Sequence, residues 1–269
     1  MRGASRDSLA AAQERLEPLL ARGGASALGQ ELYAVAGLLD SSVGLRRALT
    51  DSSRAEADRA ALAQRLLATQ VSGPTLDVVS GVVRARWSEQ RDLGDALEAL
   101  GTQAMLAGAE SDGVLDTVED ELFRFSRLVD GDRALTSALD DGRATPAQRG
   151  ALVDDLLARR ADPTTVALVR QVVTAPRGRR VSGALDDLLE AAAARRARLL
   201  AVVTAAVPLT AVQTDRLAAG LARVYGKRVQ VQVDVDPEVL GGLRVQVGGE
   251  VLDASTASRL AAARRRVVG

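Results

Sequence analysis

The chain has 269 residues, of which 47% are hydrophobic, enough for two or three small domains with real cores. It carries 35 Lys and Arg and 35 Asp and Glu side chains, so its net charge is zero and no strong field favours nucleic acid or an anionic membrane as a partner. It has no cysteine and no histidine, which excludes disulfide bonds, thiolate nucleophiles, soft-metal sites and Ser-His or Cys-His catalytic arrangements.

The N-terminus predicts neither a secretory signal nor a membrane span. A short apolar stretch at residues 9–12 is followed at once by the polar residues 13–15, so no signal peptide fits. The longest apolar stretch, residues 199–207, is far below the roughly 18 residues that a spanning helix needs. We therefore expect a soluble protein that associates with a membrane only through partners.

The first two thirds of the chain repeat one helical pattern after about ninety residues. Residues with helical apolar spacing in the first copy recur in the second as the pairs Leu28 and Val118, Leu32 and Leu122, Val35 and Phe125, and Leu39 and Val129. Paired residues are 90 positions apart at first. The separation becomes 89 where Pro74 pairs with Pro163, and 88 after the next basic loop. Two copies of one bundle of short helices are the simplest interpretation.

Helix starts are readable in both copies. Thr145 precedes a proline at the first helical position and a glutamine at Gln148 that can reach back, and Ser53 with Glu56 offers the same capping box in the first copy.

The last seventy residues carry a different pattern. Residues 229–235 alternate strictly between apolar and polar side chains, as does the run 243–247, and both predict half-buried strands. A Gly248-Gly249 turn then folds the chain into a hairpin with residues 250–252, and Ser255 is placed to cap a closing helix.

This order of elements resembles the C-terminal signature of the delta subunit of F-type proton ATP synthases, the bacterial relative of the mitochondrial oligomycin-sensitivity-conferring protein. The resemblance covers about residues 202–266, and it implies an entry strand at residues 203–209 and a helix that ends near Tyr225. The residues that carry the signature are Asp236, Pro237, Leu240, Gly241, Gly242, Gly248, Asp253 and Ser255.

The resemblance implies a mainly α chain with a C-terminal α/β domain. The expected domains are a first helical copy at residues 1–101, a second at 102–196 and the α/β domain at 197–269. The family typically has one helical bundle before the C-terminal domain, so the second copy stands in the family's position and the first is an addition. This resembles the longer delta subunits of some high-GC bacteria.

The resemblance also implies a non-catalytic, cofactor-free subunit of the peripheral stalk, present as one copy in a hetero-oligomeric complex. A helical bundle is expected to hold the N-terminal helix of an alpha subunit, and the C-terminal domain the membrane-anchored b subunits, at the cytoplasmic face of the plasma membrane. Candidate head-binding residues are Ala104, Ala107, Val166, Val169 and Val173. The alternative is that these side chains only fill their own core. Which copy binds the alpha subunit stays open.

Three other functions fit less well. A nucleic-acid binder could use the Arg264–266 run or the basic loop at residues 177–180, but both suit solvated positions, and aromatic residues make up only 2% of the chain. An enzyme would need a site built from Asp, Glu and Arg alone, and the Gly241-Gly242 and Gly248-Gly249 pairs do not open a helix as phosphate-binding loops do. A generic helical adaptor is separated from the delta subunit only by the C-terminal signature.

Trp87 is expected to be a packing residue at the edge of its bundle.

Overall fold

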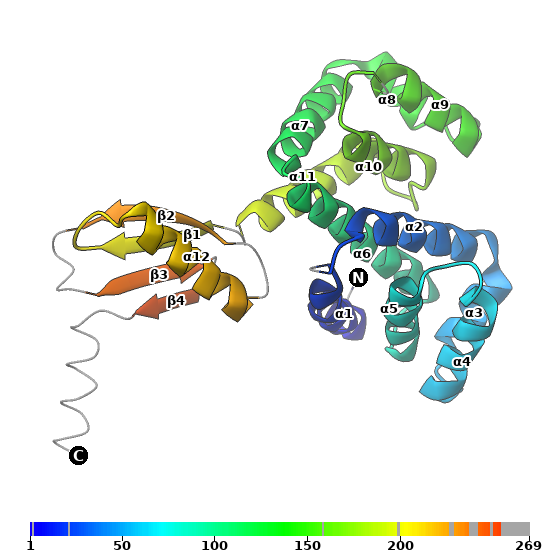
Figure 1. Cartoon of the computed structure of the whole chain (residues 1–269). Coiled ribbons are helices and arrows are strands. Elements are labelled where there is room, and N and C mark those ends of the chain that lie inside the picture. The colour runs from blue at the N-terminus through cyan, green and yellow to red at the C-terminus, as the bar shows by residue number, and fades with distance from the viewer. Residues whose placement is uncertain are drawn as a thin grey trace. The chain divides into compact units, whose positions relative to one another are not determined.

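The computed structural model describes residues 1, 3–20, 22–157, 159–197, 200–225, 229–236, 242–247 and 250–253. The chain divides into two compact units, residues 1–193 and 194–269 (Figure 1). The predicted fold class is confirmed, since the first unit is helical and the second combines strands with helix. None of the helices in the described part of the chain is both long and apolar enough to cross a bilayer.

The helices of the first unit run in the order α1 (Ala4–Leu20), α2 (Ala25–Ser41), α3 (Val43–Thr50), α4 (Glu56–Leu67), α5 (Gly73–Arg84), α6 (Gln90–Ser111), α7 (Leu115–Gly131), α8 (Arg133–Leu139), α9 (Pro146–Leu157), α10 (Pro163–Thr174) and α11 (Val181–Ala197). The second unit contains β1 (Leu200–Ala205), α12 (Ala211–Tyr225), β2 (Gln230–Val235), β3 (Leu243–Val247) and β4 (Glu250–Asp253).

The internal repeat appears as two copies of the same helices. Helices α2 to α5 recur as α7 to α10, each beginning 90 residues later. The 89-residue pairing of Pro74 with Pro163 is therefore wrong, and the fully buried Thr75 corresponds to the fully buried Thr165. The two prolines occupy different positions in the first turn, where either is tolerated because the backbone N–H groups there lack intrahelical partners.

In each copy, one glutamate and one arginine hold the two ends of the same helix, which is α5 in the first copy and α10 in the second. In the first copy the Ser72 N–H donates to Glu31 at 3.0 Å, and Arg59 donates to the Arg84 carbonyl at 2.9 Å. Negative charge at the N-terminus and positive charge at the C-terminus complement the helix dipole. The counterparts ninety residues later run from the Asp162 N–H to Glu121 at 2.8 Å and from Arg149 to the Thr174 carbonyl at 3.5 Å.

Of the two predicted capping boxes, one is confirmed. The Gln148 N–H donates to the Thr145 hydroxyl at 3.2 Å, and the Thr145 N–H donates to the Gln148 side chain at 2.8 Å. The box at Ser53 is wrong, because α4 is preceded by Ala55 and Ser53 instead donates its N–H and hydroxyl to Asp51, at 3.0 and 2.6 Å. Ser53 is thus held in a local turn by Asp51 and does not cap the helix.

Helix α6 belongs to both copies. It is the last helix of the first copy, and its residues 94–110 lie ninety positions after α1, which makes it also the first helix of the second copy. The expected boundary between residues 101 and 102 falls inside it. Figure 1 shows α6 running between the α1–α5 group and the α7–α10 group.

Helix α2 crosses α6 at glycines, which lets the two backbones approach closely. A Cβ on Gly29 would lie 2.8 Å from the Met105 Cγ and 2.9 Å from the Gly101 carbonyl oxygen, closer than side chains tolerate. Beside this crossing, the hydroxyls of Tyr33 and Thr102 are hydrogen-bonded at 2.8 Å. The two copies are therefore joined through the shared helix α6 rather than by a linker.

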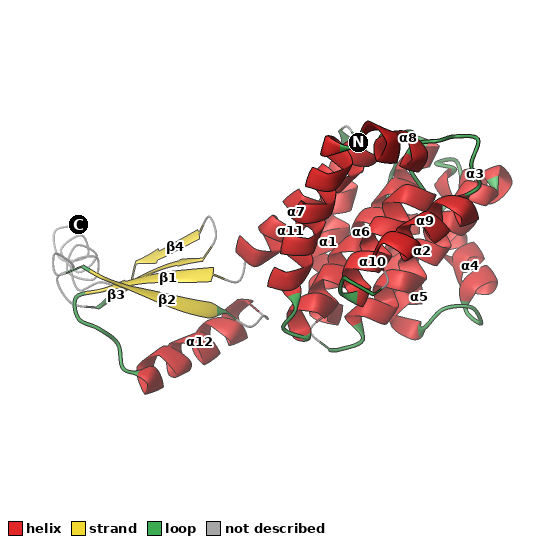
Figure 2. Ribbon diagram, turned by 90° about the horizontal axis from the view of Figure 1, so that it is seen from above, coloured by secondary structure: helices red, strands yellow, loops and turns green. Residues whose placement is uncertain are grey.

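The second unit is a four-stranded sheet with strand order β2-β1-β3-β4. Strands β1 and β2 are parallel, and the other neighbours are antiparallel. Helix α12 lies along one face of the sheet (Figure 2), where Leu221 packs with Val203, Val229 and Val245.

The strands predicted at residues 229–235 and 243–247 are confirmed, as is the end of the preceding helix at Tyr225. The entry strand is displaced, since it spans residues 200–205 instead of 203–209. Pro208 cannot donate a ladder hydrogen bond, so a strand through it is disfavoured. The helix predicted after Ser255 lies outside the described residues.

Candidate functional site

The structure places most candidate head-binding residues inside the first unit. Ala104 and Ala107 are 0% and 5% exposed and pack in one core with residues of α1 to α5. Val169 and Val173 are also buried, and Val166 is half-buried. These alanines and the two deepest valines are therefore not part of an open surface.

The C-terminal signature is described in part. Asp236 follows β2 and donates its N–H to the Ala205 carbonyl at 2.9 Å. Gly242 has a φ of 83°, a left-handed conformation that glycine adopts without strain, and it stands directly before β3. Asp253 ends β4 opposite Arg244. The remaining signature residues, Pro237, Leu240, Gly241, Gly248 and Ser255, lie outside the described part of the chain.

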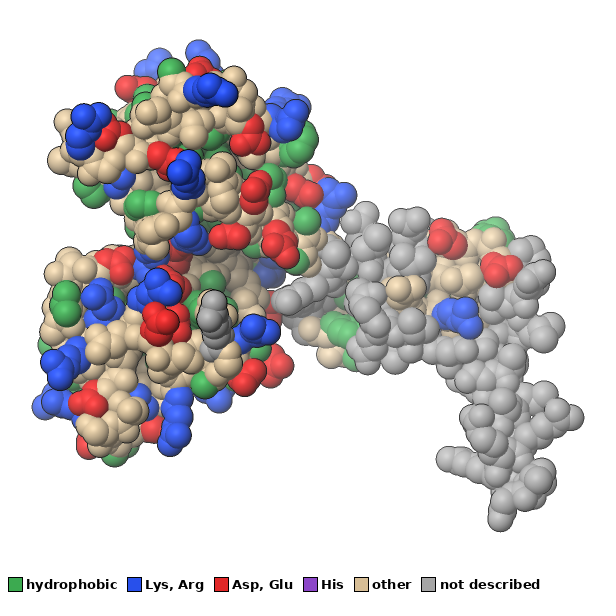
Figure 3. Space-filling view, turned by 180° about the vertical axis from the view of Figure 1, so that it is seen from behind, with side chains coloured by type: hydrophobic (Ala, Val, Ile, Leu, Met, Phe, Trp, Pro, Cys, Tyr) green, Lys and Arg blue, Asp and Glu red, His purple; other side chains and the backbone are tan. Residues whose placement is uncertain are grey.

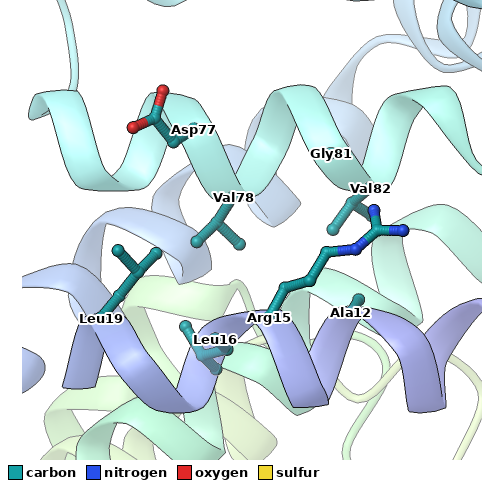
Figure 4. A pocket seen from close by; sticks show the side chains of 8 residues that line it. All are labelled: Ala12, Arg15, Leu16, Leu19, Asp77, Val78, Gly81 and Val82. Carbon is teal, nitrogen blue, oxygen red and sulfur yellow. The ribbon is translucent and has the colours of Figure 1, made fainter. Parts of the chain in front are cut away.

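A groove opens between α1 and α5 of the first copy (Figure 4). Its cavity volume is about 220 Å³. The residues that line it are Ala12, Arg15, Leu16, Leu19, Asp77, Val78, Gly81 and Val82. Most of this lining is aliphatic, as in grooves that accept the apolar face of a helix.

The groove is open beside Gly81, which has no side chain. A Cβ added there would meet only the Arg15 Nη1 atom, at 3.9 Å. Near the same end of α5, Trp87 donates its indole N–H to the Val82 carbonyl at 3.0 Å and packs against the core, as expected for a packing residue. This contact fixes the last turn of α5, and with it one wall of the groove.

The second copy does not repeat this lining. At the 90-residue offset, Gln171 stands where the first copy has Gly81, and Ala167 stands where it has Asp77. Met105 takes the place of Arg15 and is 2% exposed. None of the head-binding candidates chosen from the sequence lines this groove, although the exchange of Gly81 for Gln171 was a readable difference between the copies.

A cluster of charged side chains joins the two copies. Arg177 lies between α10 and α11, and its guanidinium contacts Asp40 of α2 at 2.6 Å and, on the shared helix α6, Asp95 at 3.2 Å and Glu98 at 2.8 Å. The prediction of a solvated basic loop is wrong here, because the Arg177 side chain is only 9% exposed. A Cβ on Gly94 would lie 2.6 Å from its Nη1, so a glycine on α6 makes room for this arginine.

The pKa values in the cluster reflect burial. Burial raises the pKa of the Glu98 carboxyl, and the nearby Arg179 and Arg177 offset only part of that rise. Each carboxylate has an arginine partner, which suits a structural joint. In the described residues, no group of three or more Asp and Glu side chains is arranged to hold a metal ion.

Surface charge does not single out a further site on the visible face of the helical unit. In Figure 3, acidic and basic side chains are interspersed over that face. Such mixing is typical of a solvated protein surface and unlike the basic stripe of a nucleic-acid binder.

The comparisons with known proteins agree with one another. The family model described as "ATP synthase delta (OSCP) subunit" matches residues 102–267. A protein of Streptomyces coelicolor named "ATP synthase subunit delta" is 52% identical over 269 residues, covering 99% of this chain and 98% of the relative. Proteins of the same name from Beutenbergia cavernae and Thermobifida fusca are 50% and 42% identical, and both comparisons cover 100% of each chain. The relatives thus match the first helical copy as well, which the family model does not include.

Proposed function

Because the chain belongs to the ATP synthase delta (OSCP) subunit family, whose members are non-catalytic components of the peripheral stalk, we propose that it binds the catalytic head and the membrane-anchored b subunits at the same time. The helical unit holds the N-terminal helix of an alpha subunit, and the C-terminal unit holds the C-terminal helices of the b subunits. The head then cannot turn with the rotor, so rotor torque goes into ATP synthesis.

The groove between α1 and α5 supports the head contact. It is aliphatic, it is open, and it lies between two antiparallel helices that can flank a third. Each Leu or Val that a partner helix buries there contributes roughly 1.5–3 kcal/mol, so a few such residues give a contact that resists dissociation. We place the contact in this groove instead of at Ala104, Ala107, Val169 and Val173, because those residues are already buried.

The C-terminal unit supplies the second contact in this proposal. The segment that begins at Asp236 after β2 and ends at Gly242 before β3 carries the family signature. A subunit that works in this way is attached to the cytoplasmic face of the plasma membrane through its partners.

Calorimetric titration tests the head contact. The ligand is a synthetic peptide of the first twenty or so residues of the alpha subunit from the same organism, and the full chain is the receptor. We expect saturable binding that Gly81→Gln weakens at least about tenfold, since filling the groove removes the burial of one or more aliphatic side chains. Gly44→Gln on α3 is the matched control, because no atom lies within 4 Å of a Cβ there.

Two results would contradict the proposal. Absence of saturable binding to the wild-type chain would remove the head contact, and equal weakening by Gly81→Gln and Gly44→Gln would remove the groove. A second titration with the C-terminal segment of a b subunit tests the other contact independently.

A further inference from the structure

The two ends of the α1–α5 groove carry opposite charges. Figure 4 shows Asp77 on α5 at the end where Leu19 lies, with its carboxylate pointing away from α1, and Arg15 reaching toward the end where Val82 lies. Both charged side chains are exposed at the rim. Among the described residues, neither has an ion-pair partner, so both charges remain available to whatever occupies the groove.

The side chains set this polarity, because the backbone dipoles cancel. In Figure 4 the order of the labelled residues shows that α1 and α5 run antiparallel along the groove. Their macrodipoles therefore oppose each other at each end. Glu17, the acidic residue of α1 nearest to Leu19, is turned away and accepts a hydrogen bond from Gln103 of α6 at 2.5 Å.

The polarity belongs to the first copy alone. The corresponding positions of the second copy are Met105 and Ala167, which carry no charge. The charged pair therefore accompanies the open groove and is absent where Gln171 replaces Gly81.

We propose that the groove accepts a helix in one direction only, with the N-terminus of the bound helix beside Asp77 and its C-terminus beside Arg15. The bound helix then runs parallel to α5 and antiparallel to α1. This inference rests on the proposed function and adds the orientation and charge of the partner helix. Its positive N-terminal end faces the Asp77 carboxylate, and its negative C-terminal end faces the Arg15 guanidinium.

The same geometry defines the chemistry of the preferred partner. Between the two charged ends, the bound face must be aliphatic to match Leu16, Val78 and Val82. A basic side chain or the free amino group near its N-terminus, and an acidic side chain near its C-terminus, add to the dipole interaction. Asp77 and Arg15 are thus specificity-determining residues, whereas the aliphatic lining provides the affinity.

Orientation can be measured directly because the chain has no cysteine of its own. We would attach a fluorophore at Gly73→Cys, at the Asp77 end of α5, or at Arg84→Cys, at the opposite end. The probe is the alpha-subunit peptide with a nitroxide at its N-terminus. We expect strong quenching in the Gly73→Cys protein and weak quenching in the Arg84→Cys protein, and the reverse order when the nitroxide is at the C-terminus of the peptide. Equal or opposite quenching would overturn the orientation.

Neutral substitutions test the two charges in the unlabelled full chain. Arg15→Gln and Asp77→Asn should each weaken peptide binding about two- to fivefold at low salt, and should reduce the dependence of binding on ionic strength. Arg65→Gln and Asp58→Asn, both exposed on α4, are matched controls that should bind as the wild type does.

The outcomes separate this inference from the proposed function. If the wild type binds and Gly81→Gln does not, the groove is the site. If Arg15→Gln and Asp77→Asn then bind as tightly as the wild type, the polarity has no role and the inference is wrong. Failure of the wild type to bind any form of the peptide contradicts the proposed function itself.

Discussion

The Nε atom of Arg177 lies 2.8 Å from the Oε2 atom of Glu98, and this ion pair connects the loop between α10 and α11 to the shared helix α6. Both side chains are more than nine-tenths buried. Arg177 is also the one non-glycine residue in the described part of the chain with a positive φ, 50°. A left-handed backbone costs such a residue about 1–2 kcal/mol, so the ion cluster must offset local strain as well as desolvation.

Replacing Arg177 by methionine should destabilise the helical unit strongly. The substitution keeps much of the side-chain volume but leaves the Glu98 carboxylate buried with less compensation, and breaking a buried pair in this way costs about 3–5 kcal/mol. Urea unfolding measures the change. Arg143→Met is the control, since its side chain is 93% exposed and its loss should change stability by less than about 0.5 kcal/mol. Similar midpoints for the two variants would contradict a role for the cluster.

The pH dependence of stability should reveal the raised pKa of Glu98. Burial raises the pKa of this carboxyl in the folded state above its unfolded value, and burial also raises the pKa of Asp40. A native state that holds the proton more tightly is favoured at low pH, so this contribution is complete below the unfolded pKa and is lost as pH rises through the folded pKa.

Unfolding of the wild type and of Glu98→Gln between pH 4 and pH 7 checks this sign. The stability of the wild type relative to the variant should decrease as the pH rises over that range. A relative stability that increases with pH would mean that the arginines lower the pKa of Glu98 by more than burial raises it.

Replacing Gly29 by alanine should destabilise the helical unit. Its added Cβ would meet the Met105 side chain at 2.8 Å and the Gly101 carbonyl at 2.9 Å, so α2 and α6 would have to separate. Overpacking of this kind costs about 1–3 kcal/mol. Gly37→Ala, eight residues later on α2, meets no atom within 4 Å and should instead stabilise the chain by up to about 1 kcal/mol through helix propensity. Thermal unfolding of the two variants should therefore shift in opposite directions.

Gly242→Val should weaken the C-terminal unit selectively. The residue has a φ of 83°, where a side chain costs about 1–2 kcal/mol and a β-branched one costs more. We expect loss of binding to the b-subunit segment with little change in binding to the alpha peptide. Gly220→Val on α12 is the control, because nothing lies within 4 Å of its Cβ. Wild-type affinity for b in the Gly242→Val protein would show that the backbone conformation at Gly242 does not organise the contact.

Deleting residues 1–88 should leave a poorly folded protein even though the cut avoids α6. The deletion removes α2, which covers Ala104 and Met105, so apolar surface that is 0% and 2% exposed would face water. Light scattering and the cooperativity of urea unfolding would detect the change. A soluble, cooperatively folded fragment would show that the second copy does not depend on the first.

The sequence predicts local elements well where the signal is local. The alternation at residues 230–235 requires only that one face of a strand be buried, and the Thr145 box requires only its own turn. It cannot show which helix faces are covered. Tyr33 and Phe123 are equivalent in the repeat, but Tyr33 is 9% exposed and Phe123 is 54% exposed, because α6 extends over α2.

The same limit explains the misjudged site residues. Ala104 and Val169 have the spacing of a docking surface, yet that spacing is equally typical of a core, and only tertiary contacts decide between the two. Arg177 looks like part of a solvated loop until its carboxylate partners, up to 137 residues earlier in the chain, are brought beside it. The groove is open at Gly81 because few atoms lie near it, and the spacing of apolar residues in the sequence does not show this.

The length of α6 sets the angular register of the two copies. One additional residue near its middle would rotate every following side chain by about 100° and advance it by roughly 1.5 Å. The residues that now face Gly29 would turn away from it, while the leucines before the insertion would keep their places in the first core. We therefore expect insertions and deletions in the connecting loops, because the 22-residue helix fixes the angle between the two copies.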